Sequence, residues 1–358
     1  MKKTLSILCA LSLSAALFVG CGSTSVASSS EVSTETAASS EAVSSPEEAA
    51  SEDAASESTV VNVAALKGPT AMGMVEFMNE ADNGEITDGE FNFTINAAVD
   101  EVSAALAQGT ADIAAVPANL ASVLYNNTNG GVEVLAINTL GVLYIVENGD
   151  TVQSVEDLRG KTIYASGKGS TPEYALNYIL SQSGIDPETD VTIEWKSEHA
   201  ECLSALMSSE DAIAMLPQPF VTTAQTKSSD IRVALDLTQE WDALQADSET
   251  PSALITGVAV VRTEFAQEHP EEVTAFMSHY EDSVAFVNEN TAEAAELVGS
   301  YEIVTAEVAE KALPACNIVC ISGDEMKSKL SGYLSVLYDQ NPKAVGGTLP
   351  GDDFYYNG

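Results

Sequence analysis

The stretch YASGKGSTPEY, residues 164–174, decides the fold because a glycine turn in it joins a predicted strand to a predicted helix. The residues before the turn alternate in polarity as in a strand, and those after it have helical spacing. Ser170 and Glu173 have the spacing of a capping box, and Pro172 is compatible with the first turn of a helix. Such a turn directs free backbone N–H groups, with the positive end of a helix dipole behind them, toward one place.

A similar stretch lies about a hundred positions earlier. Residues 61–66 are strand-like, the turn reads Lys-Gly-Pro-Thr at 67–70, and residues 71–78 have helical spacing. The later turn reads Lys-Gly-Ser-Thr at 168–171. The sequence therefore contains the same strand–turn–helix unit twice.

A second pair of matching segments follows the two turns at nearly the same distance. DIAAVP ends at Pro117, 50 positions after Lys67, and DAIAMLP ends at Pro217, 49 positions after Lys168. Two matches in register predict two similar α/β lobes that present equivalent turns to one cleft. Strand and helix patterns alternate in each lobe, which predicts a mainly parallel sheet flanked by helices.

Two apolar, β-rich stretches, residues 132–146 and 252–261, are expected to cross between the lobes. The first lobe is then expected to consist of residues 60–146 and 258–358, the later part forming a helical cover and a tail of loop. Residues 147–257 are expected to form the second lobe, inserted into the first.

The amino end has the pattern of an export signal. Lys2 and Lys3 precede an apolar run too short to span a bilayer, so residues 1–20 are expected to be a signal peptide. Gly20-Cys21 resembles the bacterial lipoprotein signal, in which the cysteine becomes the lipidated amino terminus; an ordinary secretory signal with a chance cysteine is the alternative. Residues 21–59 are rich in Ser and Glu and are expected to be a disordered tether.

The charge balance excludes nucleic acid as a partner. The formal net charge is −40. Eight of the 54 acids and none of the 14 bases lie in the tether, and two bases lie in the signal, which leaves 46 acids against 12 bases, a net charge of −34. Such a surplus also disfavours a strongly anionic ligand, although a local nest of N–H groups can override the global field.

The cysteines and histidines give no metal pattern. Cys202, Cys316 and Cys320 fall in the folded part, where buried free thiols are expected, with a Cys316–Cys320 disulfide as the open alternative. His199, between acidic neighbours, is interpreted as part of an exposed helix-cap cluster.

With these features, the chain resembles the substrate-binding component of an ABC importer, in the branch that binds nitrate, sulfonates, taurine and thiamine pyrimidine precursors. The motifs LKGPT (66–70), GKGSTPEY (167–174) and MLPQPF (215–220) carry the resemblance, which covers residues 60–338. It implies a type II periplasmic-binding-protein fold that closes on a small polar or heteroaromatic molecule. It also implies a monomer that is not an enzyme, needs no cofactor, is anchored by lipid outside the cytoplasm, and docks on permease and ATPase subunits. Gln218 stands where the family usually shows Glu.

The expected ligand contacts lie on the two turns, the strand ends and the crossings. They are Lys67, Gly68, Pro69, Thr70, Pro117, Asn119, Thr139, Gly169, Ser170, Thr171, Pro217, Gln218 and Thr256. Helix capping, turn punctuation and ordinary strand packing are the alternatives for these positions. Backbone N–H groups and the amides of Asn119 and Gln218 are the preferred contacts, ahead of Lys67 and Lys168.

Four aromatic residues, Trp195, Trp241, Tyr144 and Tyr174, have core or rim packing as their default and stacking on a ring as the alternative. A biosynthetic enzyme on the same fold, of the thiamine-pyrimidine or menaquinone type, and a surface sensor domain are the competing functions. We expect a ligand with a planar or small polar head that is neutral or zwitterionic.

Overall fold

The computed structural model describes residues 59–246 and 252–358, so the predicted signal, the lipidated cysteine and the tether lie outside the described residues, apart from the last residue of the tether. The described residues all belong to one compact unit. None of the helices within the described ranges has the length and apolar character needed to cross a membrane.

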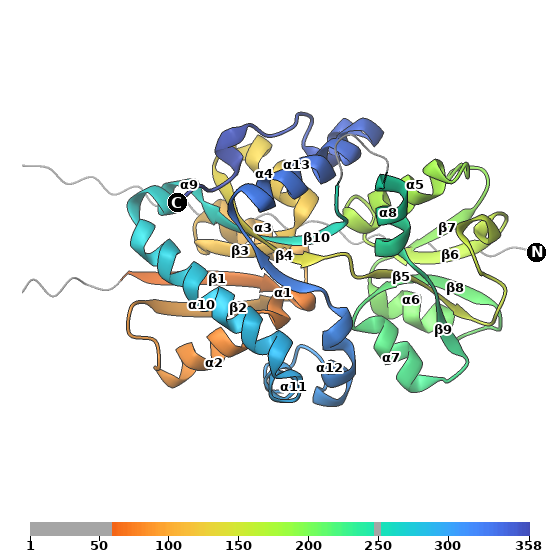
Figure 1. Ribbon diagram of the computed structural model, residues 1–358, viewed down its shortest axis with the longest axis horizontal. Coiled ribbons are helices and arrows are strands. Elements are labelled where there is room, and N and C mark those ends of the chain that lie inside the picture. The colour runs from red at the N-terminus through yellow and green to blue at the C-terminus, as the bar shows by residue number, and fades with distance from the viewer. Residues whose placement is uncertain (1–58, 247–251) are drawn as a thin grey trace, which may run out of the picture. The chain divides into compact units, whose positions relative to one another are not determined.

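The first lobe is the name we give to sheet A and the helices around it (Figure 1). Its strands are β1 (Val60–Leu66), β2 (Glu90–Asn96), β3 (Ile113–Pro117), β4 (Val132–Leu140), β10 (Ile255–Arg262) and β11 (Ile318–Ile321). Its helices are α1 (Pro69–Met72), α2 (Val75–Asn83), α3 (Val99–Gln108), α4 (Ala118–Thr128), α9 (Thr263–Glu268), α10 (Pro270–Glu289), α11 (Thr291–Ser300), α12 (Ala306–Ala312) and α13 (Gly323–Gln340), with the short 3₁₀ turns η2 (Leu313–Ala315), η3 (Pro342–Val345) and η4 (Asp352–Phe354).

The second lobe is sheet B with its helices. Its strands are β5 (Leu143–Asn148), β6 (Thr162–Ser166), β7 (Thr192–Lys196), β8 (Ala212–Pro217) and β9 (Ile231–Asp236). Its helices are α5 (Thr171–Gln182), α6 (His199–Leu206), α7 (Phe220–Lys227) and α8 (Leu237–Gln245), with the 3₁₀ turn η1 (Val155–Leu158).

The two sheets have the same topology over five strands, which confirms the repeat. Sheet A runs β2-β1-β3-β10-β4, with β11 added beyond β4, and sheet B runs β7-β6-β8-β5-β9. In each sheet the first three strands are parallel, the fourth is antiparallel to both of its neighbours, and the fifth again points with the first three.

The reversed strands β10 and β5 explain why the sheets are mixed rather than simply parallel. The chain leaves each sheet at its carboxyl edge and enters the other sheet at its carboxyl edge, since Leu143 pairs with Pro217 and Gly257 pairs with Pro117. A strand that enters at that edge must run back against the parallel strands. Most strands of each sheet therefore point the same way, as predicted. The strand pairs made by β10, β11 and β5 are antiparallel and were not predicted.

Several elements differ from the sequence prediction. The first helix is divided at Gly73 into α1 and α2, and residues 152–160 contain only the 3₁₀ turn η1. Helices α8 and α9 were not expected, and the tail contains η3 and η4 with the buried side chains of Val345 and Phe354. The tail is therefore a packed part of the first lobe.

The positions of β5 and β10 also shift the predicted lobe limits. Residues 143–146 of β5 lie within the range expected for the first lobe but pair in sheet B, and residues 255–257 lie within the range expected for the second lobe but pair in sheet A. We define the crossing segments as residues 138–143 and 252–257. That the lobes move as separate bodies about these segments stays a prediction.

The apolar core consists of three clusters of buried side chains, of which one packs against both sheets and the other two pack against one sheet each. One cluster of buried side chains contains Val116 and Ile137 of sheet A together with Ile163 and Met215 of sheet B. A second cluster covers the opposite face of sheet A with α2 and α10, and a third covers the opposite face of sheet B with α6 and α7. The first cluster thus buries apolar side chains of both lobes together, and this burial stabilises their contact.

Candidate ligand site

Two predicted contacts, Pro117 and Thr139, lie on either side of Gly257 at the edge of sheet A where its parallel strands end. Pro117 at the end of β3 pairs with Gly257 of β10, and Gly257 pairs with Thr139 of β4. The turn at 67–70 follows directly from β1, the other neighbour of β3. In open α/β sheets this edge is the usual place for a ligand.

The first turn is closed by local hydrogen bonds. Gly68 has φ 140° and ψ −156°, a conformation that favours glycine, and starts α1. The Thr70 hydroxyl donates to the carbonyl of Leu66 over 2.8 Å, and the N–H of Lys67 donates to the carbonyl of Asn96 over 2.9 Å. The side chain of Lys67 is exposed.

The second turn uses two of the N–H groups that were expected to face a ligand. The N–H of Gly169 donates to the Glu173 carboxylate over 2.6 Å, and the N–H of Ser170 donates to the carbonyl of Gly167. Ser170 precedes α5, but its hydroxyl donates to the carbonyl of Gly167, so the predicted capping box between Ser170 and Glu173 is not formed. Gly167 and Gly169 have φ of 83° and 81°, which explains why glycine occupies both positions.

The first residue of α5 links the two lobes. The hydroxyl of Thr171, which is buried, donates to Oδ1 of Asn119 in α4 over 3.4 Å and accepts from the Tyr333 hydroxyl of α13 over 3.2 Å. The Asn119 amide nitrogen donates to the carbonyl of Ala344 over 3.1 Å. The structure thus brings Asn119 and Thr171 together, and the amide of Asn119 is engaged with protein groups.

The end of β8 places Gln218 in a buried position. Its Oε1 accepts from the N–H of Thr222 and, over 2.9 Å, from the Thr222 hydroxyl. Its backbone N–H donates to the carbonyl of Val142 in the crossing. The side-chain oxygen of Gln218 is therefore occupied by hydrogen bonds from the first turn of α7. Pro217, at the end of β8, pairs with Leu143 of β5.

Unpaired polar groups collect at the crossing segments. Both amide atoms of Asn138 and the hydroxyls of Thr139, Thr238 and Thr256 are buried without a hydrogen-bond partner in the described part of the chain. Thr139 and Thr256 were predicted contacts, whereas Asn138 and Thr238 were missed. Asn138 stands in a strand that also contains Glu133 and Thr139, so residue type alone did not single it out.

The second lobe has a serine–histidine pair at its carboxyl edge that sequence reasoning also missed. The hydroxyl of Ser166, at the end of β6, lies 2.5 Å from Nδ1 of His199, the first residue of α6. The imidazole also packs on the ring of Phe220, with centroids 5.3 Å apart. Burial lowers the pKa of His199 to about 4, so its ring is neutral at pH 7. The interpretation of His199 as part of an exposed cap is wrong, because its ring reaches the buried Ser166.

Two of the four aromatic residues considered as stacking contacts, Trp241 and Tyr144, contact other protein groups instead. Trp241 of α8 is buried between the rings of Tyr178 and Tyr333, which agrees with its default reading. The hydroxyl of Tyr144 in β5 donates to the carbonyl of Ala315 over 3.3 Å, a further hydrogen bond between the lobes.

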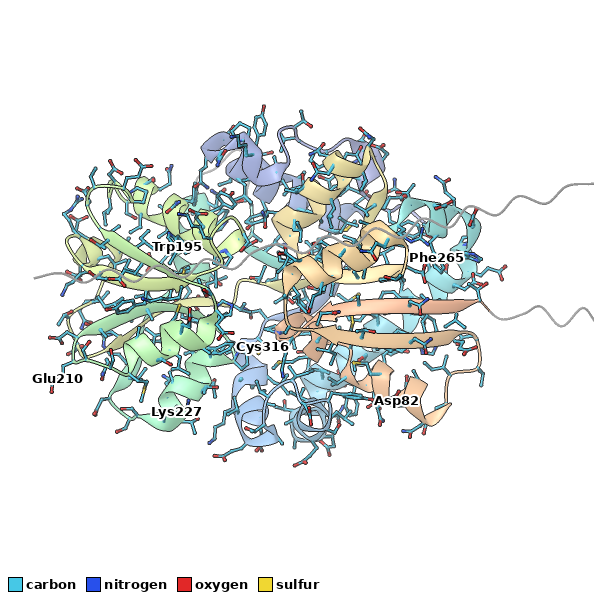
Figure 2. The ribbon with its side chains drawn as sticks, turned by 180° about the vertical axis from the view of Figure 1, so that it is seen from behind. Asp82, Trp195, Glu210, Lys227, Phe265 and Cys316 are labelled. Atoms are coloured by element: carbon cyan, nitrogen blue, oxygen red, sulfur yellow. The ribbon has the colours of Figure 1, made fainter. Side chains whose placement is uncertain are left out.

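The cysteines of the described part are free. Cys316, at the border between the two lobes, is buried, and burial raises its pKa to about 12 (Figure 2). Its sulfur lies 3.9 Å from the sulfur of Met72. The open alternative of a Cys316–Cys320 disulfide is therefore not adopted.

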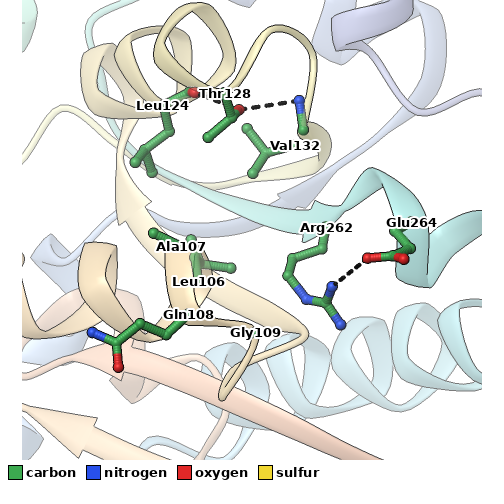
Figure 3. A pocket seen from close by; sticks show the side chains of 10 residues that line it. Leu106, Ala107, Gln108, Gly109, Leu124, Thr128, Val132, Arg262 and Glu264 are labelled. Carbon is green, nitrogen blue, oxygen red and sulfur yellow. Dashed lines mark hydrogen bonds and ion pairs between the residues drawn. The ribbon is translucent and has the colours of Figure 1, made fainter.

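A hollow of about 350 Å³ lies at the opposite, amino edge of sheet A (Figure 3). Arg262, at the end of β10, borders it together with the last turns of α3 and α4, and its guanidinium points toward Glu264. The guanidinium also pairs with the buried Asp112 over 2.9 Å. This hollow contains none of the predicted ligand contacts.

The comparison with protein families identifies the chain. Residues 84–312 match the model of the family described as ABC transporter, phosphonate, periplasmic substrate-binding protein. The match covers more than half of the chain, and the chain belongs to this family of extracytoplasmic binding proteins that serve ABC transporters. A search of curated proteins found no match.

Solved structures show the same fold. An ABC transporter protein from Parabacteroides distasonis is 23% identical with a TM-score of 0.69, over 84% of this chain and 99% of that chain. The periplasmic aliphatic sulphonate binding protein SsuA from Escherichia coli is 14% identical with a TM-score of 0.66, over 83% of this chain and 92% of that chain. The alkanesulfonate-binding protein SsuA from Xanthomonas axonopodis pv. citri, bound to MOPS, is 15% identical with a TM-score of 0.59, over 82% of this chain and 94% of that chain. These likenesses support the two-lobed binding-protein fold.

Proposed function

We propose that this binding protein captures a small polar or heteroaromatic molecule, neutral or zwitterionic, between its two lobes and delivers it to the permease of its transporter. The observation that carries the proposal is the pair of hydrogen bonds at Thr171 of the second lobe, which donates to Asn119 and accepts from Tyr333, both of the first lobe. Within the described ranges, the chain passes between the sheets at the two crossing segments, which suit a hinge. A molecule that contacts both lobes binds the closed state better and shifts the population toward it.

The remaining predicted contacts complete this proposal. The turn residues Gly68, Pro69 and Gly169 are placed at the ligand, with Pro117 and Pro217 at the strand ends beside it. The hydroxyls of Thr139 and Thr256 have no hydrogen-bond partner among residues 59–246 and 252–358, which leaves them available to a ligand. Lys67 stays a peripheral contact, because its side chain is exposed.

We further propose that Cys21 carries the lipid that holds the protein at the outer face of the membrane, as a monomer on a flexible leash. The support is the residue pattern of the amino end and the family's role outside the cytoplasm. Detergent-phase partitioning tests the anchor: the expressed protein is expected to enter the detergent phase, and the Cys21→Ser variant to stay in the aqueous phase. Equal partitioning of the two contradicts the anchor.

Thermal denaturation in the presence of small molecules tests the ligand proposal. Binding to the native state raises the melting temperature by mass action. A panel of sulfonates, phosphonates, nitrate, pyrimidines, flavins and amino acids is expected to yield stabilisation by an uncharged or zwitterionic compound. Stabilisation by polyanionic compounds alone contradicts the proposed ligand class.

A further inference from the structure

The side chain of Asn138 is a buried amide without a partner. Asn138 is 0% exposed, and neither its Oδ1 nor its Nδ2 has a hydrogen-bond partner in the described part of the chain. Buried side-chain amides in native proteins are nearly always paired, because an unpaired one loses its hydration and gains nothing in return. An amide with both ends unpaired therefore indicates a missing partner.

The fold makes room for this amide. Gly257 lies beside it on β10, and a Cβ at that position would come within 2.5 Å of Asn138 Oδ1 and 2.7 Å of Thr70 Cγ2. Glycine is thus required at 257 so that the amide of β4 and the first turn can approach each other. The side chain is held in place by its surroundings, not left over at a loosely packed surface.

The neighbouring hydroxyls show the same feature. Of the seven buried polar side-chain atoms that lack a partner in the described ranges, five belong to Asn138, Thr139, Thr238 and Thr256. All four residues lie on or beside the crossing segments: Thr139 pairs with Gly257, and Thr238 lies against Gly141. The Thr139 hydroxyl lies beside the amide, since a Cβ at Gly257 would come within 3.5 Å of Thr139 Oγ1 as well as 2.5 Å of Asn138 Oδ1. Unpaired groups of two residues beside one glycine point to one common partner.

The chemistry of the amide selects the partner. An amide presents an acceptor beside a donor, and its complement is a donor beside an acceptor, as on the edge of a lactam or a primary carboxamide. A phosphonate, sulfonate or carboxylate offers acceptors only, so it would pair with Nδ2 and place its negative charge against Oδ1. We infer that Asn138 is the specificity-determining residue of the ligand site, and that it binds an uncharged lactam or carboxamide group through two hydrogen bonds. This inference rests on the proposed function.

The competing explanation is a set of ordered waters that pair with these groups in the free protein. The amide would then be structural, and its removal would lower the stability of the unliganded protein. If the partner is a ligand, the unpaired amide lowers the stability of the unliganded closed form, and an apolar side chain of similar size restores that stability.

The stability arm of the test uses Asn138→Leu and Thr139→Val without any added compound. Both substitutions keep the approximate shape, and we expect the melting temperature of Asn138→Leu to be unchanged or raised by about 2–6 °C. Thr128→Val is the matched control: the Thr128 hydroxyl is fully paired, donating to the carbonyl of Leu124 and accepting from the N–H of Gly131 at the distant edge of sheet A. This control is expected to melt at a lower temperature. Lower melting temperatures for both Asn138→Leu and Thr139→Val overturn the inference.

The binding arm uses uracil and nicotinamide as neutral probes and methylphosphonate as the anionic probe. Stabilisation of the wild type and of Thr128→Val by a neutral probe, with at least a tenfold loss of affinity in Asn138→Leu, supports the inference. Stabilisation of wild type and Asn138→Leu alike by methylphosphonate overturns it and leaves the transport role of the protein intact. If no probe shifts the wild type, the stability arm decides, since it needs no ligand. A protein that no compound of the wider panel stabilises contradicts the proposed ligand capture itself.

Discussion

The same threonine of the repeated turn has different partners in the two lobes. Thr70 donates to the carbonyl of Leu66, four residues before it, and so closes its own turn. Thr171, at the equivalent position, bonds to Asn119 and Tyr333 of the other lobe. The repeat therefore preserves the turn, while only the second lobe uses it to reach across to the first.

The strand ends differ in the same way. Pro117 and Pro217 occupy equivalent places, but Pro117 pairs with Gly257 whereas Pro217 pairs with Leu143. Leu143 is buried in the shared core, and Gly257 leaves space that the amide of Asn138 occupies. One topology thus yields an apolar strand end in the second lobe and a polar one in the first.

A buried acid–arginine pair stands at the amino edge of both sheets, and the two pairs differ in burial. In sheet B, Glu147 is fully buried and lies 2.7 Å from Arg232. In sheet A, Asp112 is 8% exposed and pairs with Arg262 over 2.9 Å. Removing one partner of a buried pair leaves a charge without compensation, and the cost increases with burial.

The largest expected effect is that of Arg232→Met. Glu147 keeps its hydrogen bonds from Thr151 and Val152 but loses its cation, so we expect a loss of about 3 kcal/mol in the free energy of unfolding. Arg262→Met is the control in the other lobe and is expected to lose less, about 2 kcal/mol, because Asp112 is less buried and keeps its bonds from Asn62. Urea unfolding of both variants measures the difference. An equal or larger loss in Arg262→Met would break the comparison.

The pH dependence of the same pair has a definite sign. Burial alone raises the pKa of Glu147, but hydrogen bonds from Thr151 and Val152 and the charge of Arg232 outweigh it and hold the pKa below its ordinary value. The stability that this carboxylate contributes is therefore present above its unfolded pKa and is lost as the pH falls through the folded value. In Arg232→Met, the pKa of Glu147 is expected to lie closer to its ordinary value, because the charge that lowered it is gone. The stability of this variant is therefore expected to depend less on pH in the acidic range.

Gly257→Ala tests the polar strand end of the first lobe. The new Cβ would lie 2.5 Å from Asn138 Oδ1, so we expect a loss of about 2 kcal/mol in stability together with a loss of ligand affinity. Gly131→Ala is the matched control at the amino edge, where a Cβ would lie 2.9 Å from the Thr128 side chain. The control is expected to lose stability without losing affinity for whichever compound stabilises the wild type. Unchanged affinity in Gly257→Ala would separate this strand end from the ligand site.

The sequence predicted those parts of the fold that rest on local chemistry. The turn at 167–171 needs glycine at two positive-φ positions, and the strand and helix patterns on both sides of it occur twice, so the repeat of two α/β lobes could be inferred. The reversed strands could not be inferred in the same way, because their direction depends on where the crossings enter each sheet. Helix α8 was missed for a related reason: its Trp241 faces a core built from α5 and α13.

The candidate site was only partly predictable because its partners are distant in the sequence. Asn138 lacks partners in a space that exists because position 257 is glycine, 119 residues further along the chain. His199 reaches Ser166 from another strand–helix unit. Residue type and spacing indicated Thr139 and Thr256 as contacts, but nothing local to the sequence distinguishes an unpaired amide such as Asn138 from a paired one such as Asn119.

His199 gives the second lobe a pH dependence that the first lobe lacks at the equivalent helix start, which is Val99 in α3. Its pKa is lowered by burial to about 4, against about 6.5 in the unfolded chain. Between these values the unfolded state binds the proton and the native state does not, so stability falls as the pH decreases from about 6.5 to about 4. Allowing for solvent screening of a half-buried ring, we expect a loss of about 1.5 kcal/mol. Urea unfolding at pH 7 and pH 4.5 measures it, and the dependence is expected to be smaller in His199→Asn. An unchanged dependence in this variant would mean that the ring is already solvated in the native state.

The smallest expected change in stability is that of substitutions at Thr171 and Thr70, the equivalent threonines of the two turns. Thr171→Val keeps the shape but removes one hydrogen bond to Asn119 and one from Tyr333, so it should weaken contact between the lobes by about 1 kcal/mol. Thr70→Val removes one local bond and should change stability by a similar or smaller amount. Amide hydrogen exchange tells them apart: faster exchange in α4, α5 and α13 together is expected only for Thr171→Val, because its two bonds join these helices. Faster exchange confined to the turn in both variants would show that the hydroxyl of Thr171, like that of Thr70, serves its own lobe alone.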